Sequence, residues 1–377
     1  MNSIEKQKIL FVTDARHTFS EKKGGVQVCT EEYINLLRAS GFDVLLHPVE
    51  HTKKFSKRIK IKLGLDMYDR YDFDDLFELI EKVVTTEKIK YVALNQVGLS
   101  NFSRLLKSRF GDGVKVVILS HGNESGDFLH EINRRKSKSW LSRIRDVCRL
   151  GFFIANESRF FMDYVDLVLS MSGTELEINK WLGAKKGLFV PRTFSPAFLS
   201  LASQSKRIGF VGTLDHLPNE IGLEKFLAAF EKINSDNLKL RIVGGPELAG
   251  HRFQKRFGCV EYVGLLNDKE LDKEASTWAC SINPIFWYSR GASTKLAQLV
   301  NWGMPLVTTE AGNRGYIWKQ GDLLVADDAD DMAIKVKNLM ASEGSIISCA
   351  AEVRKVALSG PSLTDISQQL NKLLCHL

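Results

Sequence analysis

Small residues precede a lysine at a point where the sequence predicts the start of a helix. Residues 291–295 read Gly-Ala-Ser-Thr-Lys, and the apolar residues after them recur at i, i+3 and i+4, as on one helix face. Ser293 and Thr294 are both able to cap this helix, and Gly291 lets the backbone approach a ligand closely. The N–H groups of a helix start, its dipole and the charge of Lys295 together favour an anion such as a phosphate.

Three other loops follow the ends of predicted strands, where ligands bind in open α/β sheets. His121 lies near the end of the predicted strand 114–122, shortly after the apolar residues 116–119, which predicts that the imidazole lies at the tip of a buried strand. Gly24 and Gly25 open a helix after the first strand and allow close approach of a ligand. Asn219 follows the first strand of the second half, where it serves either as a helix cap or as a ligand contact. A purely structural role is the alternative for each of these loops.

Several common chemistries lack their sequence signatures. The first strand is not followed by a G-x-G-x-x-G fingerprint, which disfavours a dinucleotide-dependent dehydrogenase, and no Walker A loop is present. G-x-S-x-G and H-E-x-x-H are absent too, so neither a nucleophile elbow nor a metalloprotease is indicated. None of the six cysteines forms a CxxC pair, which argues against a zinc or redox motif and suits a reducing compartment.

The bulk composition is that of a globular protein with two domains. The chain has 377 residues, of which 44% are hydrophobic and 26% charged. No apolar run approaches the roughly 20 residues that a membrane helix needs. The N-terminal stretch has no signal-peptide pattern and leads directly into a strand, so we expect a cytoplasmic location.

The net charge of +7 is concentrated in two segments. One spans residues 53–62. The other spans residues 134–149 and is interrupted by apolar side chains, a pattern that predicts a basic amphipathic helix. Such a helix suits an anionic membrane surface, while a solvated charged face is the alternative. Nucleic acid is disfavoured because no known binding module accompanies the charge. In the second segment the basic residues are Arg134, Arg135, Lys136, Lys138, Arg143, Arg145 and Arg149, and the apolar ones are Trp140, Leu141, Ile144 and Val147.

Predicted strands and helices alternate along almost the whole chain, which indicates parallel sheets covered by helices on both faces. Residues 191–206 carry two prolines and four serines and are interpreted as a linker. We therefore expect two Rossmann-like domains facing a central cleft, over residues 1–195 and 206–360, and a final helix over 361–377 that returns to the first domain. The predicted strands lie at 8–14, 42–49, 91–96, 114–122, 166–172, 187–192, 207–214, 238–245, 259–264, 279–284, 305–309 and 322–327.

Taken together and in their order along the chain, the motifs of the two halves resemble those of family-4 glycosyltransferases of the GT-B fold. The resemblance rests on Gly24-Gly25, on His121, and on three stretches of the second half that read FVGTLDHLPN, IVGG and GASTKLAQLVNWGMPLVTTEAGNRG. It covers nearly the whole chain. It implies a hexosyltransferase that retains the anomeric configuration, with a nucleotide-sugar donor mainly on the second domain and a glycan or lipid-linked acceptor on the first. It also implies no cofactor and no obligatory metal.

The same resemblance implies roles for individual residues. His121 and Lys295 would be catalytic, with His121 contacting the donor sugar near the reacting centre. Gly264 and Leu265 would border the base of the nucleotide. The residues that would hold the diphosphate are Gly24, Gly25, Gly291, Ala292, Ser293, Thr294 and Lys295.

Two positions depart from the pattern of the family. Most members carry glutamates separated by seven residues, and the corresponding positions here are Arg290 and Gln298. Gln298 is still able to hydrogen-bond the ribose hydroxyls of the nucleotide, without charge. Arg290 donates only, so it suits a phosphate or an acidic sugar.

The predicted function is therefore a cytoplasmic, retaining glycosyltransferase that builds a surface polysaccharide or glycolipid, with its basic face at the inner membrane. Two alternatives stay open. A sugar-nucleotide epimerase would use the same donor without an acceptor, and a non-catalytic homologue would bind the donor without turnover.

Overall fold

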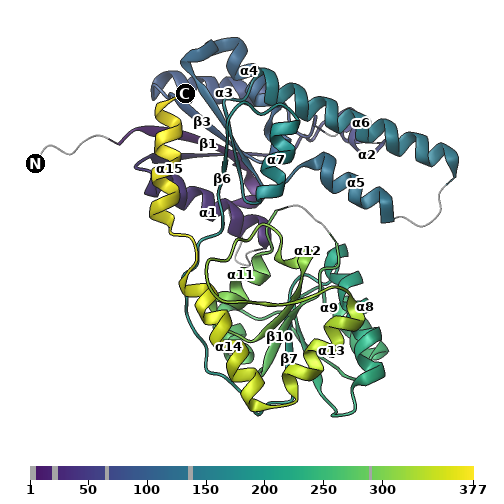
Figure 1. The fold of residues 1–377 in the computed structure, drawn as a ribbon. Coiled ribbons are helices and arrows are strands. Elements are labelled where there is room, and N and C mark those ends of the chain that lie inside the picture. The colour runs from purple at the N-terminus through teal and green to yellow at the C-terminus, as the bar shows by residue number, and fades with distance from the viewer. Residues whose placement is uncertain (1–5, 19–23, 64–67, 135–138, 288–290) are drawn as a thin grey trace, which may run out of the picture. The chain divides into compact units, whose positions relative to one another are not determined.

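The computed structural model describes residues 6–18, 24–63, 68–134, 139–287 and 291–377. The chain divides into two units (Figure 1). Unit 1 comprises residues 1–191 and 362–377, and unit 2 comprises residues 192–361. The segment 191–206, interpreted above as a linker, contains neither a helix nor a strand.

Unit 1 is built on a six-stranded parallel sheet with the order β2-β1-β3-β4-β5-β6. The central strands β3 and β4 are buried at every position except Lys115, which is half-buried, because helices cover both faces of the sheet, as their apolar runs predict. The strands are β1 (Lys8–Asp14), β2 (Asp43–Val49), β3 (Tyr91–Asn95), β4 (Lys115–Ser120), β5 (Leu167–Ser170) and β6 (Gly187–Phe189).

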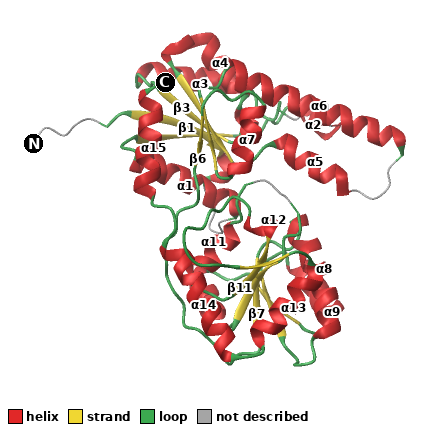
Figure 2. Cartoon of the chain, viewed as in Figure 1, coloured by secondary structure: helices red, strands yellow, loops and turns green. Residues whose placement is uncertain are grey.

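Helices alternate with these strands and form a layer on each face of the sheet (Figure 2). Of the described helices in unit 1, α6 is the longest, with 24 residues. Three short 3-10 turns, η1 (Ala15–His17), η2 (Val97–Leu99) and η3 (Gly111–Gly113), complete the connections. The α-helices are α1 (Gly25–Ala39), α2 (Phe55–Leu63), α3 (Phe73–Thr86), α4 (Asn101–Phe110), α5 (Glu124–Arg134), α6 (Trp140–Asp163), α7 (Gly173–Trp181) and α15 (Leu363–Cys375).

The C-terminal helix α15 belongs to unit 1 although it follows unit 2 in the sequence. Its buried residues Leu370 and Leu374 share an apolar cluster with Ile9 and Phe11 of β1. The hydroxyl of Tyr91 donates to the carbonyl oxygen of Leu374 at 3.1 Å. Burial of one helix face thus ties the end of the chain to the first strand.

Unit 2 repeats the architecture with a second six-stranded parallel sheet, ordered β12-β11-β10-β7-β8-β9. Its strands are β7 (Arg207–Val211), β8 (Lys239–Val243), β9 (Val260–Gly264), β10 (Cys280–Asn283), β11 (Leu306–Thr309) and β12 (Leu324–Ala326). Its helices are α8 (Leu217–Ile233), α9 (Glu247–Arg256), α10 (Asp268–Ala275), α11 (Thr294–Asn301), α12 (Glu310–Asn313), α13 (Ala329–Met340) and α14 (Glu343–Leu358).

The two sheets confirm the predicted fold class of parallel sheets with helices on both faces. Every predicted strand is present, and most ends agree within about three residues, the usual uncertainty of a boundary. No described helix combines the length and the apolar composition that a bilayer crossing requires.

The single basic helix predicted over residues 134–149 is wrong. Arg134 is the last residue of α5, and α6 begins at Trp140. Ser139 caps α6, because its side chain accepts from the backbone N–H of Ser142 at 3.4 Å. Arg135, Lys136 and Lys138 lie outside the described residues, so only the part of the segment from Trp140 onward forms the amphipathic helix.

Candidate active site

The loop in front of α11 has the local structure that its sequence predicts. Gly291 has a φ of 72°, a backbone conformation that disfavours residues with a Cβ. Ser293 is the N-cap of α11 and accepts from the N–H of Leu296 at 3.3 Å. Gly303 follows the helix with a φ of 63°, as a terminating glycine should. The first N–H groups of α11, on Thr294 and Lys295, have no acceptor within the helix and suit an anion.

Two side chains from outside the loop fix its carbonyl groups. Arg192 is buried and donates from Nε and Nη2 to the carbonyl oxygen of Ala292, at 3.3 and 3.1 Å. The hydroxyl of Tyr316 donates to the carbonyl oxygen of Ser293. The loop is therefore held in place by groups that do not occupy its N–H donors.

Lys295 lies against Asn219 and Phe210. Its ammonium donates to the amide oxygen of Asn219 and lies 5.2 Å from the centre of the Phe210 ring. Gly212 makes room for this arrangement, because a Cβ there would come within 3.0 Å of Cδ of Lys295. Burial, together with the positive charge of Arg314, lowers the pKa of Lys295 to about 7.

Arg314 is the second cation of this region. It is buried, and its Nη1 donates to the carbonyl oxygen of Ala311 at 2.7 Å. The like charges of Arg314 and Lys295 repel each other, so an anion bound beside them would stabilise both. Among the residues that the structure describes, no carboxylate forms an ion pair with Lys295.

Glycines lie at the carboxyl ends of three neighbouring strands of unit 2: Gly212 follows β7, Gly244 follows β8, and Gly264 is the last residue of β9. Gly244 and Gly264 have φ values of 145° and 100°, and the N–H of Gly244 donates to the carbonyl oxygen of Gly264 at 2.9 Å. A Cβ on Gly244 would overlap the carbonyl oxygen of Gly212. Next to Gly264, the side chain of Leu265 is 53% exposed, which leaves an apolar surface at the carboxyl edge of the sheet.

Gln298 lies one helical turn after Thr294 and Lys295 and on the same face of α11. It is half-buried. Arg290, its counterpart in the family pattern, lies outside the described residues.

In unit 1, His121 is buried at the end of β4 and bound to Asn95 at the end of β3. The distance from His121 Nε2 to Asn95 Oδ1 is 2.8 Å. The amide nitrogen of Asn95 donates to the hydroxyls of Thr13 and Thr30, at 2.8 and 2.9 Å. The ring of Tyr33 packs 5.6 Å from the imidazole. Three strands and α1 thus contribute to one buried polar cluster.

This cluster determines which nitrogen of His121 carries the proton. Thr30 donates its own hydroxyl to the carbonyl oxygen of Val26 at 2.9 Å, so it accepts from Asn95. Thr13 likewise has a carbonyl acceptor, that of Asp14 at 3.5 Å. Asn95 must therefore present its amide oxygen to His121, which donates from Nε2. The neutral imidazole consequently has its lone pair on Nδ1.

Gly24 and Gly25 stand at the start of α1, as predicted. Gly24 is the N-cap, and its N–H donates to the side-chain oxygen of Gln27 at 3.1 Å. The amide nitrogen of Gln27 donates in turn to the carbonyl oxygen of Arg16 at 3.1 Å. Gln27 thus connects the glycine turn to the chain that follows β1.

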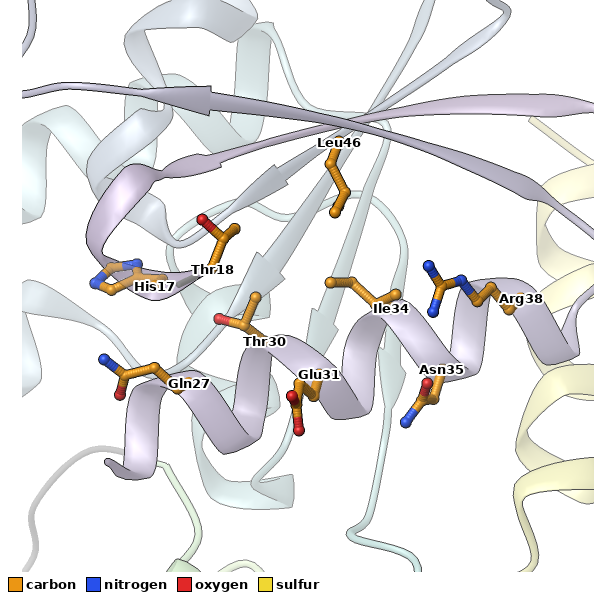
Figure 3. A pocket seen from close by; sticks show the side chains of 9 residues that line it. All are labelled: His17, Thr18, Gln27, Thr30, Glu31, Ile34, Asn35, Arg38 and Leu46. Atoms are coloured by element: carbon orange, nitrogen blue, oxygen red, sulfur yellow. The ribbon is translucent and has the colours of Figure 1, made fainter. Parts of the chain in front are cut away.

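A groove of about 350 Å³ runs between α1 and the edge strand β2. Figure 3 shows Leu46 of β2 pointing toward Ile34 of α1, with polar side chains along the helix and at the end of the groove near His17. Its lining residues are His17, Thr18, Gln27, Thr30, Glu31, Ile34, Asn35, Arg38 and Leu46.

Asn219 is not a helix cap. The cap of α8 is His216, and Asn219 is the third residue of the helix. Its amide nitrogen donates to the carbonyl oxygen of Thr213 at 2.7 Å, which turns its oxygen toward Lys295. Asn219 therefore positions the ammonium group, and its contact with a ligand stays a prediction.

Sequence reasoning missed Arg192, Arg314, Tyr316 and Asn95. Arg314 alone had a signal, because it lies within the motif-bearing stretch 289–315. The other three act through contacts between residues far apart in the sequence. In the described part of the chain, histidine, cysteine and carboxylate side chains form no group of three or more that could hold a metal ion.

Comparison with known proteins gives one family match, and it lies in unit 2. Residues 205–342 match the model of Glycosyl transferases group 1. The comparison with curated protein sequences gives no match.

Solved structures resemble the chain over almost its entire length. Sucrose-phosphate synthase from Thermosynechococcus elongatus has a TM-score of 0.71 at 16% identity, covering 98% of this chain and 99% of that one. HepE from Anabaena, solved with UDP and glucose, has a TM-score of 0.65 at 14% identity, with coverage of 98% and 100%. WaaG, a glycosyltransferase involved in lipopolysaccharide biosynthesis, has a TM-score of 0.63 at 12% identity, with coverage of 97% and 99%.

These neighbours show that the chain has the GT-B fold, with two Rossmann-like units. Together with the group 1 match over unit 2, they support a glycosyltransferase of this fold.

Proposed function

We propose that the protein transfers a sugar from a nucleotide-diphosphate-sugar to a glycan or a lipid-linked acceptor, with retention at the anomeric carbon. The observation that carries this proposal is the pair of cations Lys295 and Arg314 beside the start of α11. A helix start with a fixed loop and two nearby cations suits a diphosphate.

The chemistry needs charge stabilisation on the leaving group. The bond between the anomeric carbon and the diphosphate oxygen breaks, and its electron pair leaves with the diphosphate. The acceptor hydroxyl forms the new bond on the same face and gives its proton to the departing phosphate oxygen. Lys295 and the first N–H groups of α11 would stabilise the developing charge, an effect that is often the largest catalytic contribution.

The nucleoside would lie beside the glycines of unit 2. Gly264 and Leu265 offer a backbone turn and an apolar surface for the base. Gln298 is suited to the ribose hydroxyls, since its amide both donates and accepts. We assign the contact with the donor sugar to His121, and a role in holding the diphosphate to Gly24 and Gly25.

We assign the acceptor to unit 1. The groove between α1 and β2 combines an apolar floor of Ile34 and Leu46 with amide, carboxylate and guanidinium groups. This mixture suits the apolar faces and hydroxyls of a sugar. The groove begins beside Gln27, which also binds Gly24.

We further propose that the protein works at the inner surface of a membrane, in the synthesis of a surface polysaccharide or glycolipid. The start of α6 supports this location. At about 100° per residue, one face of α6 holds Trp140, Leu141, Ile144 and Val147, which are 68%, 63%, 49% and 65% exposed. Arg143 and Arg145 lie on the two flanks of this face. A lipid-linked acceptor would be reached at such a surface.

A non-catalytic homologue is the second candidate, because Gln298 lies at a position where most family-4 glycosyltransferases have a glutamate. Such a protein would bind the donor without releasing nucleoside diphosphate. Turnover therefore separates the two candidates.

The test is a turnover screen with UDP-, GDP-, dTDP- and ADP-linked sugars, each with and without a panel of glycan and lipid-linked acceptors. We expect one donor to release nucleoside diphosphate and to give a product whose anomeric proton shows the donor configuration by NMR. Lys295→Ala should abolish release, whereas the exposed Lys225→Ala on α8 should not. Donor binding without any release would favour the non-catalytic homologue, and an inverted product would reject retention.

A further inference from the structure

Helix α2 presents an apolar stripe to solvent. Phe55, Ile59 and Leu63 lie four residues apart and are 77%, 40% and 60% exposed. At about 100° per residue, they span roughly 80° of the helix surface. A contiguous exposed stripe of large apolar side chains points to an interaction surface.

The opposite face of α2 attaches the helix to unit 1. The ammonium of Lys57 donates to Asp69 at 2.7 Å and to the carbonyl oxygen of Tyr71 at 3.0 Å. Ile61 is half-buried on the same side. Lys57 and Ile61 lie about 180° around the helix from the middle of the apolar stripe. The attachment therefore points the stripe away from the body of unit 1.

Basic residues line both edges of the stripe. By the helical repeat, Arg58 and Lys62 flank one edge and Lys60 flanks the other. All three are exposed, and none forms an ion pair with a residue that the structure describes. Lys54 and Lys57, by contrast, are paired with acidic side chains of unit 1. The flanking charges are thus the ones available to an external anion.

We propose that α2 is an interfacial helix that lies on an anionic bilayer. The stripe of Phe55, Ile59 and Leu63 would enter the boundary between headgroups and acyl chains. Arg58, Lys60 and Lys62 would lie at the level of the lipid phosphates. An apolar stripe with basic flanks has the two signals that hold a helix in this plane. This site is separate from the α6 surface of the proposed function and does not depend on sugar transfer.

The test is co-sedimentation of the full-length protein with two kinds of vesicle. One contains phosphatidylcholine alone, and the other contains equal parts of phosphatidylcholine and phosphatidylglycerol. We expect binding to the anionic vesicles only, and weaker binding as salt is added. Replacing Phe55, Ile59 and Leu63 by Ser should lower binding at least about tenfold. Reversing Arg58, Lys60 and Lys62 to Glu should lower it about 100-fold.

Matched controls separate α2 from the rest of unit 1. The double variant Leu79→Ser/Lys82→Glu changes an exposed leucine and an exposed lysine of α3 and should bind as wild type. Amide hydrogen exchange should slow in residues 55–63 when anionic vesicles are added, and stay unchanged in α3. Circular dichroism should show every variant folded, since the changed side chains are exposed.

Three results would overturn the proposal. They are absence of wild-type binding to anionic vesicles, wild-type binding by both α2 variants, and vesicle protection confined to α6. None of these concerns donor binding, so a failure here leaves the proposed transfer reaction to its own test.

Discussion

The polar clusters at the strand ends of the two units differ in charge: the cluster of unit 1 is neutral, and the cluster of unit 2 carries two cationic side chains. In unit 1, His121, Asn95, Thr13 and Thr30 satisfy one another through hydrogen bonds between neutral groups. In unit 2, Lys295 lies close enough to Arg314 for the like charge to lower its pKa, with one amide oxygen as its partner.

This difference separates the roles that the two clusters can have. A cluster whose donors and acceptors are matched internally holds a side chain in one orientation. A cluster with excess charge instead gains free energy when an oppositely charged ligand arrives. We therefore expect unit 2 to supply most of the donor affinity and unit 1 to supply orientation near the sugar.

The largest effect should follow from removing the charge in unit 2. Lys295→Ala deletes a charge-assisted contact with the diphosphate, which costs about 3 kcal/mol or roughly 100-fold in donor affinity. Isothermal titration of the donor found in the turnover screen measures this loss. Lys225→Ala is the control for an exposed lysine of the same unit. If wild type and Lys295→Ala bound the donor with equal affinity, the claim that the cationic cluster of unit 2 supplies most of the donor affinity would be wrong.

A change in unit 1 should affect stability and orientation rather than donor affinity. Asn95→Leu leaves the buried Nε2–H of His121 without its acceptor, which should lower the free energy of unfolding by about 2 kcal/mol. Urea denaturation measures this change. Long-range ¹H–¹⁵N spectra should show the Nε2–H form of neutral His121 in wild type and a mixture in the variant. A wild-type ring protonated on Nδ1 would contradict the hydrogen-bond assignment.

A smaller effect is expected where unit 2 uses a neutral contact. Gln298→Ala removes one hydrogen bond to the ribose, worth about 0.7 kcal/mol or roughly threefold in donor affinity. Titration with the nucleoside diphosphate and with its 2′-deoxy form provides the check. The variant should lose the preference for the ribose form, and a retained preference would place the ribose elsewhere.

The fold could be predicted because its signals are local. Short apolar runs such as residues 9–12 predicted the buried parallel strands. Gly303 and Ser293 marked the ends of α11 because a terminating glycine and a capping serine act within a few residues of the helix. The length of the basic helix was mispredicted, since charge spacing alone carried no signal for the cap at Ser139.

Residues of the candidate site could be proposed from the sequence only where they lie next to a helix start or a strand end. Lys295 was singled out because it follows a capping loop, and His121 because it lies at the tip of a predicted strand. Arg192 looked like part of a linker, although it binds Ala292 a hundred residues away. Asn95 ended an ordinary strand, and its contact with His121 depends on how β3 and β4 pair. Such roles follow from tertiary contacts, which short-range patterns do not contain.

The depressed pKa of Lys295 makes donor binding depend on pH in a defined direction. With a pKa of about 7, the protonated fraction falls from about one half at pH 7 to about one tenth at pH 8. If the diphosphate binds the protonated form of Lys295, the affinity for the donor should fall about fivefold between pH 7 and pH 8. For folding the sign is reversed. The unfolded chain binds the proton more tightly, so the contribution of Lys295 to stability rises between pH 7 and its ordinary pKa of 10.5.

The most direct test of a cationic donor site is proton uptake at pH 8. The donor is titrated calorimetrically in buffers with different ionisation enthalpies, for wild type and for Lys295→Ala. We predict that wild type takes up close to one proton per donor bound and that the variant takes up none. Tight donor binding without proton uptake would contradict the account, because the diphosphate would then not be held by Lys295.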